Sequence, residues 1–239
     1  MKEKFRYVKR EDRKKILLLC DDIRMHSGIA TMAREIVIGT SHHFNWLNLG
    51  AALHHPEAGQ GFDISKEVDK LTGLDDSWVR VLPNNGYGDA MQIRQLITQE
   101  QPDAIFIFTD PRYWTWLFEI EREVRNKIPL MYLNIWDDYP APLYNKPYYE
   151  SCDLLMAISK QTKNINKIVL GELAEDKVIK YVPHGINEDM FFPITKEHEM
   201  YKGLQEFKKN LFGGKDYEYV VFWNSRNIRR KSPGDVILS

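Results

Sequence analysis

Residues 16–40 read ILLLCDDIRMHSGIATMAREIVIGT, an apolar run followed by a polar turn and a mixed segment. The first five residues show no polar alternation, which is typical of a strand buried on both faces of a sheet. A loop is expected over Asp21–Ser27, and Gly28–Thr40 carries apolar residues at helical spacing. A fully buried strand that leads directly into an amphipathic helix is the repeating unit of a parallel α/β sheet.

The same alternation continues along the chain. Further strands are predicted over residues 44–49, 78–82, 104–108, 130–136, 153–158 and 178–182. Helices are predicted over 89–100, over 114–126 and from Ser159 onward, with Asp89 and Ser159 placed as N-caps. Residues 50–77 are expected to form a long loop with one short helical piece. We therefore expect an α/β fold with a Rossmann-like parallel sheet covered on both faces.

A break follows the last of these strands. Beyond an irregular stretch over 183–193, the sequence predicts a polar helix over 196–211, a strand over Tyr217–Trp223 and a helix from Pro233. We expect residues 1–192 to form an N-terminal domain, with a polar tail over 1–15, and residues 193–239 to begin a second Rossmann-like domain. Because one strand cannot bury a core of its own, we expect this second domain to be incomplete and the chain truncated.

Charge and composition narrow the class of protein. Lys and Arg total 33 against 34 Asp and Glu, a formal net charge of -1, which favours no nucleic-acid partner. No apolar run approaches the roughly 20 residues of a membrane span. Cys20 and Cys152 lie in or beside apolar runs, as reduced core cysteines do, so we expect a soluble, cytoplasmic protein. The basic excess of residues 1–15 leaves open a solvated tail or a weak contact with a membrane surface.

Ser27 and Gly28 precede a helix at the carboxyl end of a predicted strand. Ligands of open α/β sheets bind beyond these ends, and a helix N-terminus offers N–H groups to an anion. An ordinary strand-to-helix turn is the alternative. Further along, Gly86 and Gly88 begin a partial dinucleotide motif, but Met91 takes its third glycine position, so we expect no Rossmann cofactor.

Two histidine pairs, at residues 42–43 and 54–55, raise the question of a metal site. Adjacent residues on a strand point to opposite faces, and the sequence supplies no cysteine or carboxylate cluster to complete a tetrahedral set. We expect no metal site.

A basic segment, WNSRNIRRKSP at residues 223–233, leaves the last predicted strand and enters a helix start. Arg226 and Lys231 suit a diphosphate at such a position, because a guanidinium binds phosphate oxygens in a fork and the helix dipole adds to the attraction. A solvated basic loop is the alternative.

Taken in order, three segments resemble the retaining GT-B glycosyltransferases of the family-4 type. The turn at Ser27-Gly28 is similar to the family's donor-phosphate loop. The segment PHGINEDMFFP at residues 183–193 is similar to its interdomain segment. Ser225-Arg226, with Lys231 five residues later, is similar to its diphosphate loop. The resemblance extends over nearly the whole chain from about residue 15.

The resemblance implies a reaction, the transfer of a sugar with retention from a nucleotide-diphosphate sugar to a hydroxyl of a carbohydrate or glycolipid acceptor. It implies no cofactor beyond that donor substrate. The residues that it assigns to donor binding are Ser27, Gly28, Arg226 and Lys231. It places the acceptor on the N-terminal domain, where residues 113–149 are dense in aromatics of the kind that pack on sugar rings.

Two aspartates are candidates for catalytic roles. Asp110 follows the fourth predicted strand and is a candidate to orient the acceptor, with a loop-capping role as the alternative. Asp137 lies where the family often has a histidine that contacts the donor sugar, and it is a candidate to accept a sugar hydroxyl.

The family's pattern is not complete in this chain. Ser225 replaces a glycine, and the two glutamates that hold the donor sugar and ribose in the family lie downstream of its arginine–lysine loop, beyond Ser239. We therefore expect the 239-residue chain alone to bind donor poorly and to transfer no sugar. Two alternatives stay open, a non-catalytic sugar- or partner-binding module completed by another polypeptide, and a GT-B nucleotide-sugar epimerase.

Overall fold

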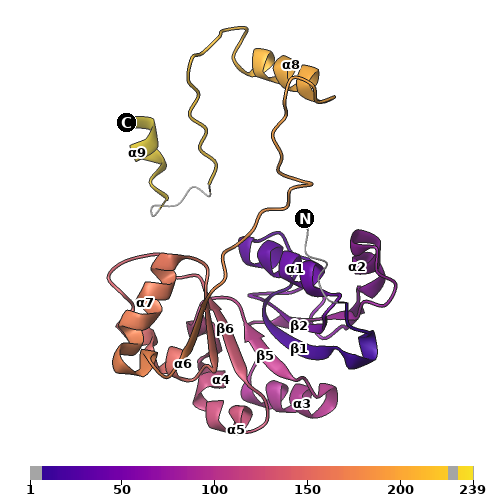
Figure 1. Ribbon diagram of the computed structural model, residues 1–239, viewed down its shortest axis with the longest axis vertical. Helices are drawn as coiled ribbons and strands as arrows, with labels where there is room; N and C mark the ends of the chain where they lie inside the picture. Colours follow the sequence, from indigo (N-terminus) through magenta and orange to yellow (C-terminus); the bar gives the residue numbers. More distant parts are fainter. Residues whose placement is uncertain (1–6, 226–230, 239) are drawn as a thin grey trace. The chain divides into compact units, whose positions relative to one another are not determined.

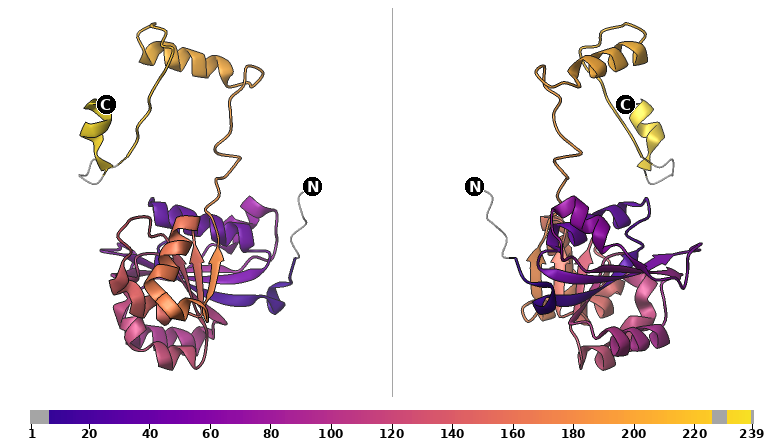
Figure 2. Two further views of the ribbon diagram at one scale, coloured as in Figure 1. Left: turned by 60° about the vertical axis from the view of Figure 1, so that its left-hand side comes forward. Right: turned by 90° about the vertical axis from the view of Figure 1, so that its right-hand side faces the viewer.

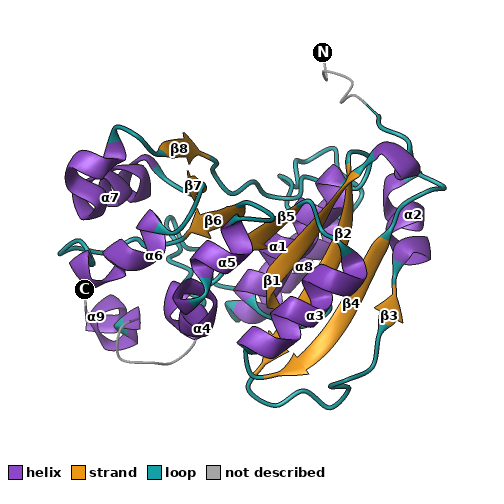
Figure 3. Ribbon diagram, turned by 90° about the horizontal axis from the view of Figure 1, so that it is seen from below, coloured by secondary structure: helices purple, strands orange, loops and turns teal. Residues whose placement is uncertain are grey.

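The computed structural model describes residues 7–225 and 231–238, and its main feature is an 8-stranded sheet in the order β3-β4-β2-β1-β5-β6-β7-β8 (Figures 1 and 3). Every neighbouring pair is parallel except β3 with β4, which is antiparallel. The strands are β1 Lys14–Asp21, β2 Phe44–Ala52, β3 Phe62–Asp63, β4 Val79–Asn85, β5 Ala104–Ile107, β6 Leu130–Asn134, β7 Leu154–Ala157 and β8 Val178–Tyr181. The predicted α/β class with a parallel, Rossmann-like sheet is confirmed.

Helices cover the sheet in two layers (Figure 1). The α-helices are α1 Gly28–Thr40, α2 Ser65–Thr72, α3 Ala90–Glu100, α4 Thr115–Glu119, α5 Glu121–Arg125, α6 Lys146–Glu150, α7 Lys160–Leu170, α8 Tyr201–Leu211 and α9 Pro233–Leu238. α1 and α2 pack on one face, against the alternate β1 residues Ile16 and Leu18. α3 to α7 pack on the other face, against Leu17 and Leu19. Both faces of β1 are therefore buried, which explains why its sequence is apolar without alternation.

Local sequence signals set the starts of three helices. Ser27, Asp89 and Ser159 each have an extended backbone and accept a hydrogen bond from an N–H group in the first turn of α1, α3 and α7. The caps expected at Asp89 and Ser159 are confirmed, and α1 has the bounds that the spacing of its apolar residues predicts.

Other elements differ from the prediction. The helix expected over 114–126 is divided into α4 and α5 at Ile120, whose φ of -107° and ψ of 17° leave the helical region, and it is preceded by the 3-10 helix η2 Pro111–Trp114. The helix expected over 196–211 begins only at Tyr201. The loop expected over 50–77 contains β3 as well as α2, because Phe62 pairs with Val81 at the edge of the sheet.

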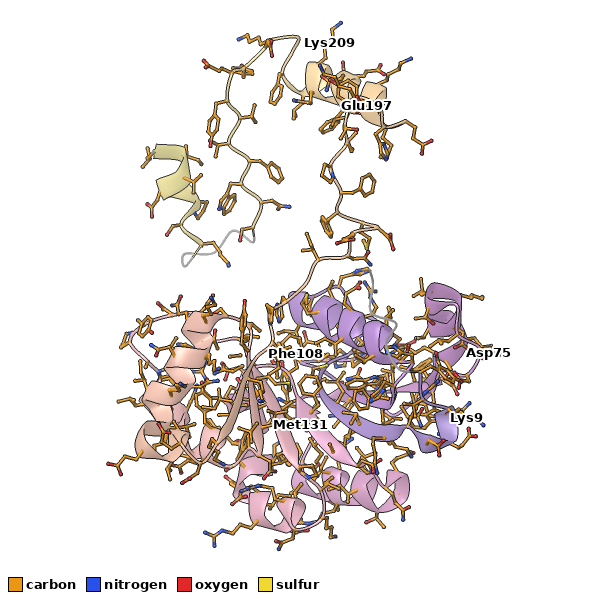
Figure 4. All side chains as sticks on the ribbon, in the orientation of Figure 1. Lys9, Asp75, Phe108, Met131, Glu197 and Lys209 are labelled. Carbon is orange, nitrogen blue, oxygen red and sulfur yellow. The ribbon has the colours of Figure 1, made fainter. Side chains whose placement is uncertain are left out.

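The chain forms two compact units, Met1–Gly185 and Ile186–Ser239, whereas the boundary predicted from the sequence follows residue 192. In the part of the chain that the structure describes, the second unit contains α8 and α9, and residues 215–225 after α8 form neither a helix nor a strand (Figure 2). The strand predicted over Tyr217–Trp223 is absent, because a strand requires a neighbour to accept and donate its backbone hydrogen bonds and these residues pair with none in the described structure. Their side chains project from the ribbon (Figure 4), and Phe222 is 84% exposed.

Both cysteines lie in the first unit and are free and buried. Burial raises the pKa of the Cys152 thiol to about 12, so both the packing and the protonation of this side chain fit a core residue. Within the described ranges, none of the helices is long and apolar enough to cross a membrane.

Candidate functional site

The sheet has a topological switch point at β1. Its two neighbours are β2 and β5, and the chain runs through α1 on one face to reach β2 and through α3 on the other face to reach β5. In open α/β sheets such a point leaves a crevice beyond the carboxyl ends of the strands, where ligands bind. The residues that follow β1, β5 and β6 are therefore the first to consider.

The turn after β1 is organised around Ser27. The Ser27 Oγ accepts a hydrogen bond of 3.0 Å from the Ala30 N–H, and its hydroxyl donates one of 2.5 Å to Oδ2 of Asp21 at the end of β1. The N–H groups of Gly28 and Ile29 have no acceptor among the described residues. These two donors and the helix dipole make the N-terminus of α1 attractive to an anion, although the Asp21 carboxylate already places one negative charge nearby.

Gly28 is not required by the backbone. It lies in the first turn of α1, and a Cβ built on it would meet nothing within 4 Å. An alanine would therefore fit there without a clash, and its methyl group would lie beside the free N–H group of the same residue.

Asp110, after β5, accepts a hydrogen bond from the Arg112 N–H at 3.0 Å and thereby caps η2. Its carboxylate also accepts from Nε of Arg112 at 2.9 Å and forms an ion pair with that guanidinium. Burial alone would raise the pKa of Asp110, but the hydrogen bonds and charge of Arg112 outweigh burial and hold that pKa below its ordinary value. The loop-capping role is thus present in the structure, while the acceptor-orienting role stays a prediction.

A stacked tyrosine pair lies near these carboxylates. The rings of Tyr87 and Tyr113 are parallel within 5°, with centroids 4.2 Å apart. Burial, with smaller contributions from Asp21, Tyr113 and Asp110, raises the pKa of Tyr87 to about 12. The negative charges of Asp21 and Asp110 thus both disfavour ionisation of the Tyr87 phenol. The Tyr87 hydroxyl therefore stays protonated at neutral pH. The sequence did not predict this pair. Its one sequence feature is the position of Tyr87 between Gly86 and Gly88, which by itself does not identify a stacking partner.

Asp137 lies in the loop after β6, and the structure holds the backbone of this loop from two sides. Oδ1 of Asn134 accepts a hydrogen bond from the Trp136 N–H at 2.9 Å, and Oγ1 of Thr162 donates one to the Trp136 carbonyl at 2.8 Å. Gln161 donates to the Asp137 carbonyl at 3.1 Å. The Asp137 side chain is exposed and has no partner within the described part of the chain, which leaves its carboxylate free to accept a hydroxyl.

A buried ionic network, also unpredicted, lies beside the switch point. The fully buried Asp22 accepts hydrogen bonds from Arg24 and from Nε2 of His55, and Arg24 bridges Asp22 to Glu57. His55 is therefore held by neighbours within the protein. In residues 7–225 and 231–238, no three His, Cys, Asp or Glu side chains are grouped to hold a metal ion.

The structure brings most of the candidate residues to one edge of the sheet. Ser27 and Gly28 follow β1, Asp110 follows the adjacent β5, and Asp137 follows β6, the next strand. Arg226 lies outside the described residues. Lys231 belongs to the second unit and is exposed, and its expected role with Arg226 stays a prediction.

A scan of protein-family models and a search of curated proteins find no match to this chain. Among solved structures, the chain is similar to an alpha,alpha-trehalose-phosphate synthase (UDP-forming) from Burkholderia vietnamiensis, with 11% identity and a TM-score of 0.42. The similarity covers 81% of this chain and 54% of that chain, so the chain spans about half the length of its structural neighbour. A likeness at this level carries no functional conclusion, and the fold class rests on the sheet itself.

Proposed function

We propose that the protein is a GT-B-type glycosyltransferase that transfers a sugar with retention from a nucleotide-diphosphate sugar to an acceptor hydroxyl. The observation that carries the proposal is the turn after β1, where the N–H groups of Gly28 and Ile29 have no acceptor among the described residues and lie at the switch point of a parallel sheet. The order of the Ser27-Gly28, 183–193 and Arg226–Lys231 segments supports the assignment.

In this proposal the residues divide the chemistry between them. The N–H groups near Gly28, together with Arg226 and Lys231, neutralise negative charge that grows on the departing diphosphate. Asp137 accepts a hydroxyl of the sugar, and Asp110 orients the acceptor hydroxyl. The acceptor is a carbohydrate or glycolipid bound on the first unit.

We further propose that the 239-residue chain alone binds the donor weakly and transfers no sugar. Residues 215–225, directly before Arg226, form no strand in the described structure and pair with no sheet. Catalytic groups must be held within about 0.5 Å of their working positions. The same observation favours the second candidate function, a non-catalytic sugar- or partner-binding module whose second unit is completed by another polypeptide.

The turn after β1 can be tested directly by titrating the isotopically labelled protein with UDP- and GDP-sugars and following the backbone amides of Gly28 and Ile29 by NMR. We expect both amides to shift on addition of a nucleotide-diphosphate sugar. Gly28→Ala should weaken that binding by about tenfold, because its methyl group lies beside a free N–H group and hinders the approach of a phosphate, while the open Cβ position leaves the helix intact. Asp21→Asn should strengthen binding, because it removes the negative charge beside them.

Gly39→Ala is the matched control, since Gly39 lies in the last turn of the same helix and its Cβ would also meet nothing within 4 Å. It should leave donor binding unchanged. If nucleotide sugars shift neither amide, or if both glycine variants weaken binding equally, the turn does not bind the donor.

A further inference from the structure

A pocket of about 320 Å³ lies beside the carboxyl end of β4, between that strand and the first turns of α3. Its lining is dominated by side-chain amides, and the residues used below are Asn84, Asn85, Gln92, Gln95, Asp89 and Met91. None of the site residues predicted from the sequence lies in it.

The amides near the mouth of β4 are partly engaged with one another. Gln92 donates a hydrogen bond of 3.0 Å to Oδ1 of Asn84, and Asn84 donates one of 2.9 Å to the Asn85 carbonyl. Oδ1 of Asn85 accepts a hydrogen bond of 2.7 Å from the backbone N–H of His55. These bonds fix the orientation of three amides, so their donors and acceptors are arranged before any ligand binds.

Several hydrogen-bonding groups in the pocket are left over. In the described structure, the Gln95 side chain and the Nδ2 group of Asn85 have no partner, and the Gln92 Oε1 atom accepts no hydrogen bond. An amide both donates and accepts, as a sugar hydroxyl does. A ligand with several hydroxyl groups would therefore satisfy this set.

The charge of the pocket disfavours an anionic ligand. No cationic side chain lines it, and Asp89 is its one charged lining residue. Oδ1 of Asp89 already accepts from the N–H groups of Met91 and Gln92, at 2.8 and 2.9 Å, and so closes the N-terminus of α3 to a phosphate. A phosphate or carboxylate group would be repelled by the negative charge of Asp89 and would find no cation beside it.

The pocket lies next to the stacked tyrosine pair that was described with the candidate site. Gly88 lines it with a φ of +78°, and a Cβ there would lie 2.8 Å from Oε1 of Gln92, so the bend needs glycine. The preceding residue is Tyr87, whose ring stacks on Tyr113 and whose phenol is affected by Asp21 and Asp110. Met91, 66% exposed, adds an apolar contact at the rim.

We propose that this pocket binds a neutral carbohydrate, through the amides of Asn85, Gln92 and Gln95. That this carbohydrate is the acceptor rests on the proposed function. If it is, the acceptor of the proposed transferase is a neutral sugar. The binding of the carbohydrate does not itself depend on sugar transfer.

The test uses the full chain without any donor. Saturation-transfer NMR and amide shifts are recorded with maltose, cellobiose and lactose, and in parallel with glucuronic acid and glucose 6-phosphate. At least one neutral disaccharide should bind and shift the amides of Asn85 and Gln95, and the anionic sugars should bind more weakly. Gln95→Ala should raise its Kd by about fivefold, the effect of losing one neutral hydrogen bond.

Gln99→Ala is the matched control, because Gln99 lies one turn further along α3, is exposed and does not line the pocket. It should leave the Kd unchanged. The proposal is overturned if none of the neutral sugars binds, if the anionic sugars bind as tightly, or if both glutamine variants lose affinity equally. Neutral-sugar binding in a protein whose Gly28 and Ile29 amides shift with no nucleotide sugar would contradict the proposed function and leave the pocket assignment intact.

Discussion

Nε2 of His55 lies 3.1 Å from Oδ2 of Asp22, and this contact joins the turn after β1 to the loop after β2. Nδ1 of the same ring accepts a hydrogen bond from the Glu57 N–H at 3.1 Å. Because Nδ1 is an acceptor, Nε2 is the nitrogen that donates to Asp22. Both ring nitrogens are therefore used in holding the two loops, and His55 is a positioning residue.

His55→Ala should lower the free energy of unfolding by about 2–4 kcal/mol, because it opens a cavity and removes a hydrogen bond from a buried carboxylate. Urea unfolding measures this directly. The adjacent His54 is exposed, so His54→Ala should change stability by less than about 0.5 kcal/mol. Equal effects of the two substitutions would show that the Asp22–His55 contact contributes little.

Gly50→Ala should destabilise the first unit. A Cβ on Gly50 would lie 2.8 Å from the Cβ and 2.9 Å from the Cα of Asp22, so the backbone of the turn after β1 would have to move. We expect a cost of about 1–3 kcal/mol, measured as a lower urea midpoint.

The glycine control has the opposite sign. Gly39 lies in α1 with open space around its Cβ, and Gly39→Ala should raise stability by about 0.5–1 kcal/mol, because alanine is the better helix former. If Gly50→Ala leaves stability unchanged, β2 and the turn after β1 are not packed as closely as these distances indicate.

The Arg13–Asp76 ion pair should make stability depend on pH. Burial alone would raise the pKa of Asp76, but hydrogen bonds from Tyr7 and Arg13 outweigh it and lower that pKa below the ordinary value of 3.8. A carboxyl group whose pKa is lowered by folding stabilises the protein above its unfolded pKa, near 3.9, and loses that contribution as the pH falls toward the folded pKa.

Asp76→Asn should therefore be about 1–3 kcal/mol less stable than the natural chain at pH 7, and this difference should shrink as the pH is lowered through about 4 toward 2. Urea midpoints at pH 7, 5 and 3 test this expectation. Asp75→Asn, at the exposed neighbouring carboxylate, is the control and should show a small difference at every pH. If the stability difference between Asp76→Asn and the natural chain is the same at every pH, the contribution of Asp76 does not come from its ionised carboxylate.

Arg226→Ala and Lys231→Ala should each lower kcat/KM for sugar transfer by about 100-fold, in any form of the protein that transfers sugar, because each removes a cation from the developing charge of the leaving diphosphate. Lys209→Ala, on the exposed surface of α8, should leave the rate unchanged. If kcat/KM is unchanged in both test variants and the fold is intact, the segment is a solvated basic loop and does not bind the diphosphate.

Predictions from the sequence succeed where the physical cause is local. An unbroken apolar run identifies β1 because both of its faces are buried, and the spacing of apolar residues gives α1 its bounds. The caps at Asp89 and Ser159 depend on backbone groups within the next few residues, so they can be inferred without knowing the fold. Ser27, Gly28, Asp110 and Asp137 could be placed after strands for the same reason.

The contacts among these segments depend on residues far apart in the chain. Asp22 and His55 are separated by 33 positions, and Tyr87 and Tyr113 stack although they follow two strands, β4 and β5, that are not neighbours in the sheet. The apolar segment over 217–223 has the composition of a strand, yet it forms none in the described structure. Which segments can be buried thus follows from side-chain type and can be inferred without the fold. Strand order, network partners and strand pairing cannot, because backbone hydrogen bonds between strands and contacts across a sheet edge require a second segment in a particular register.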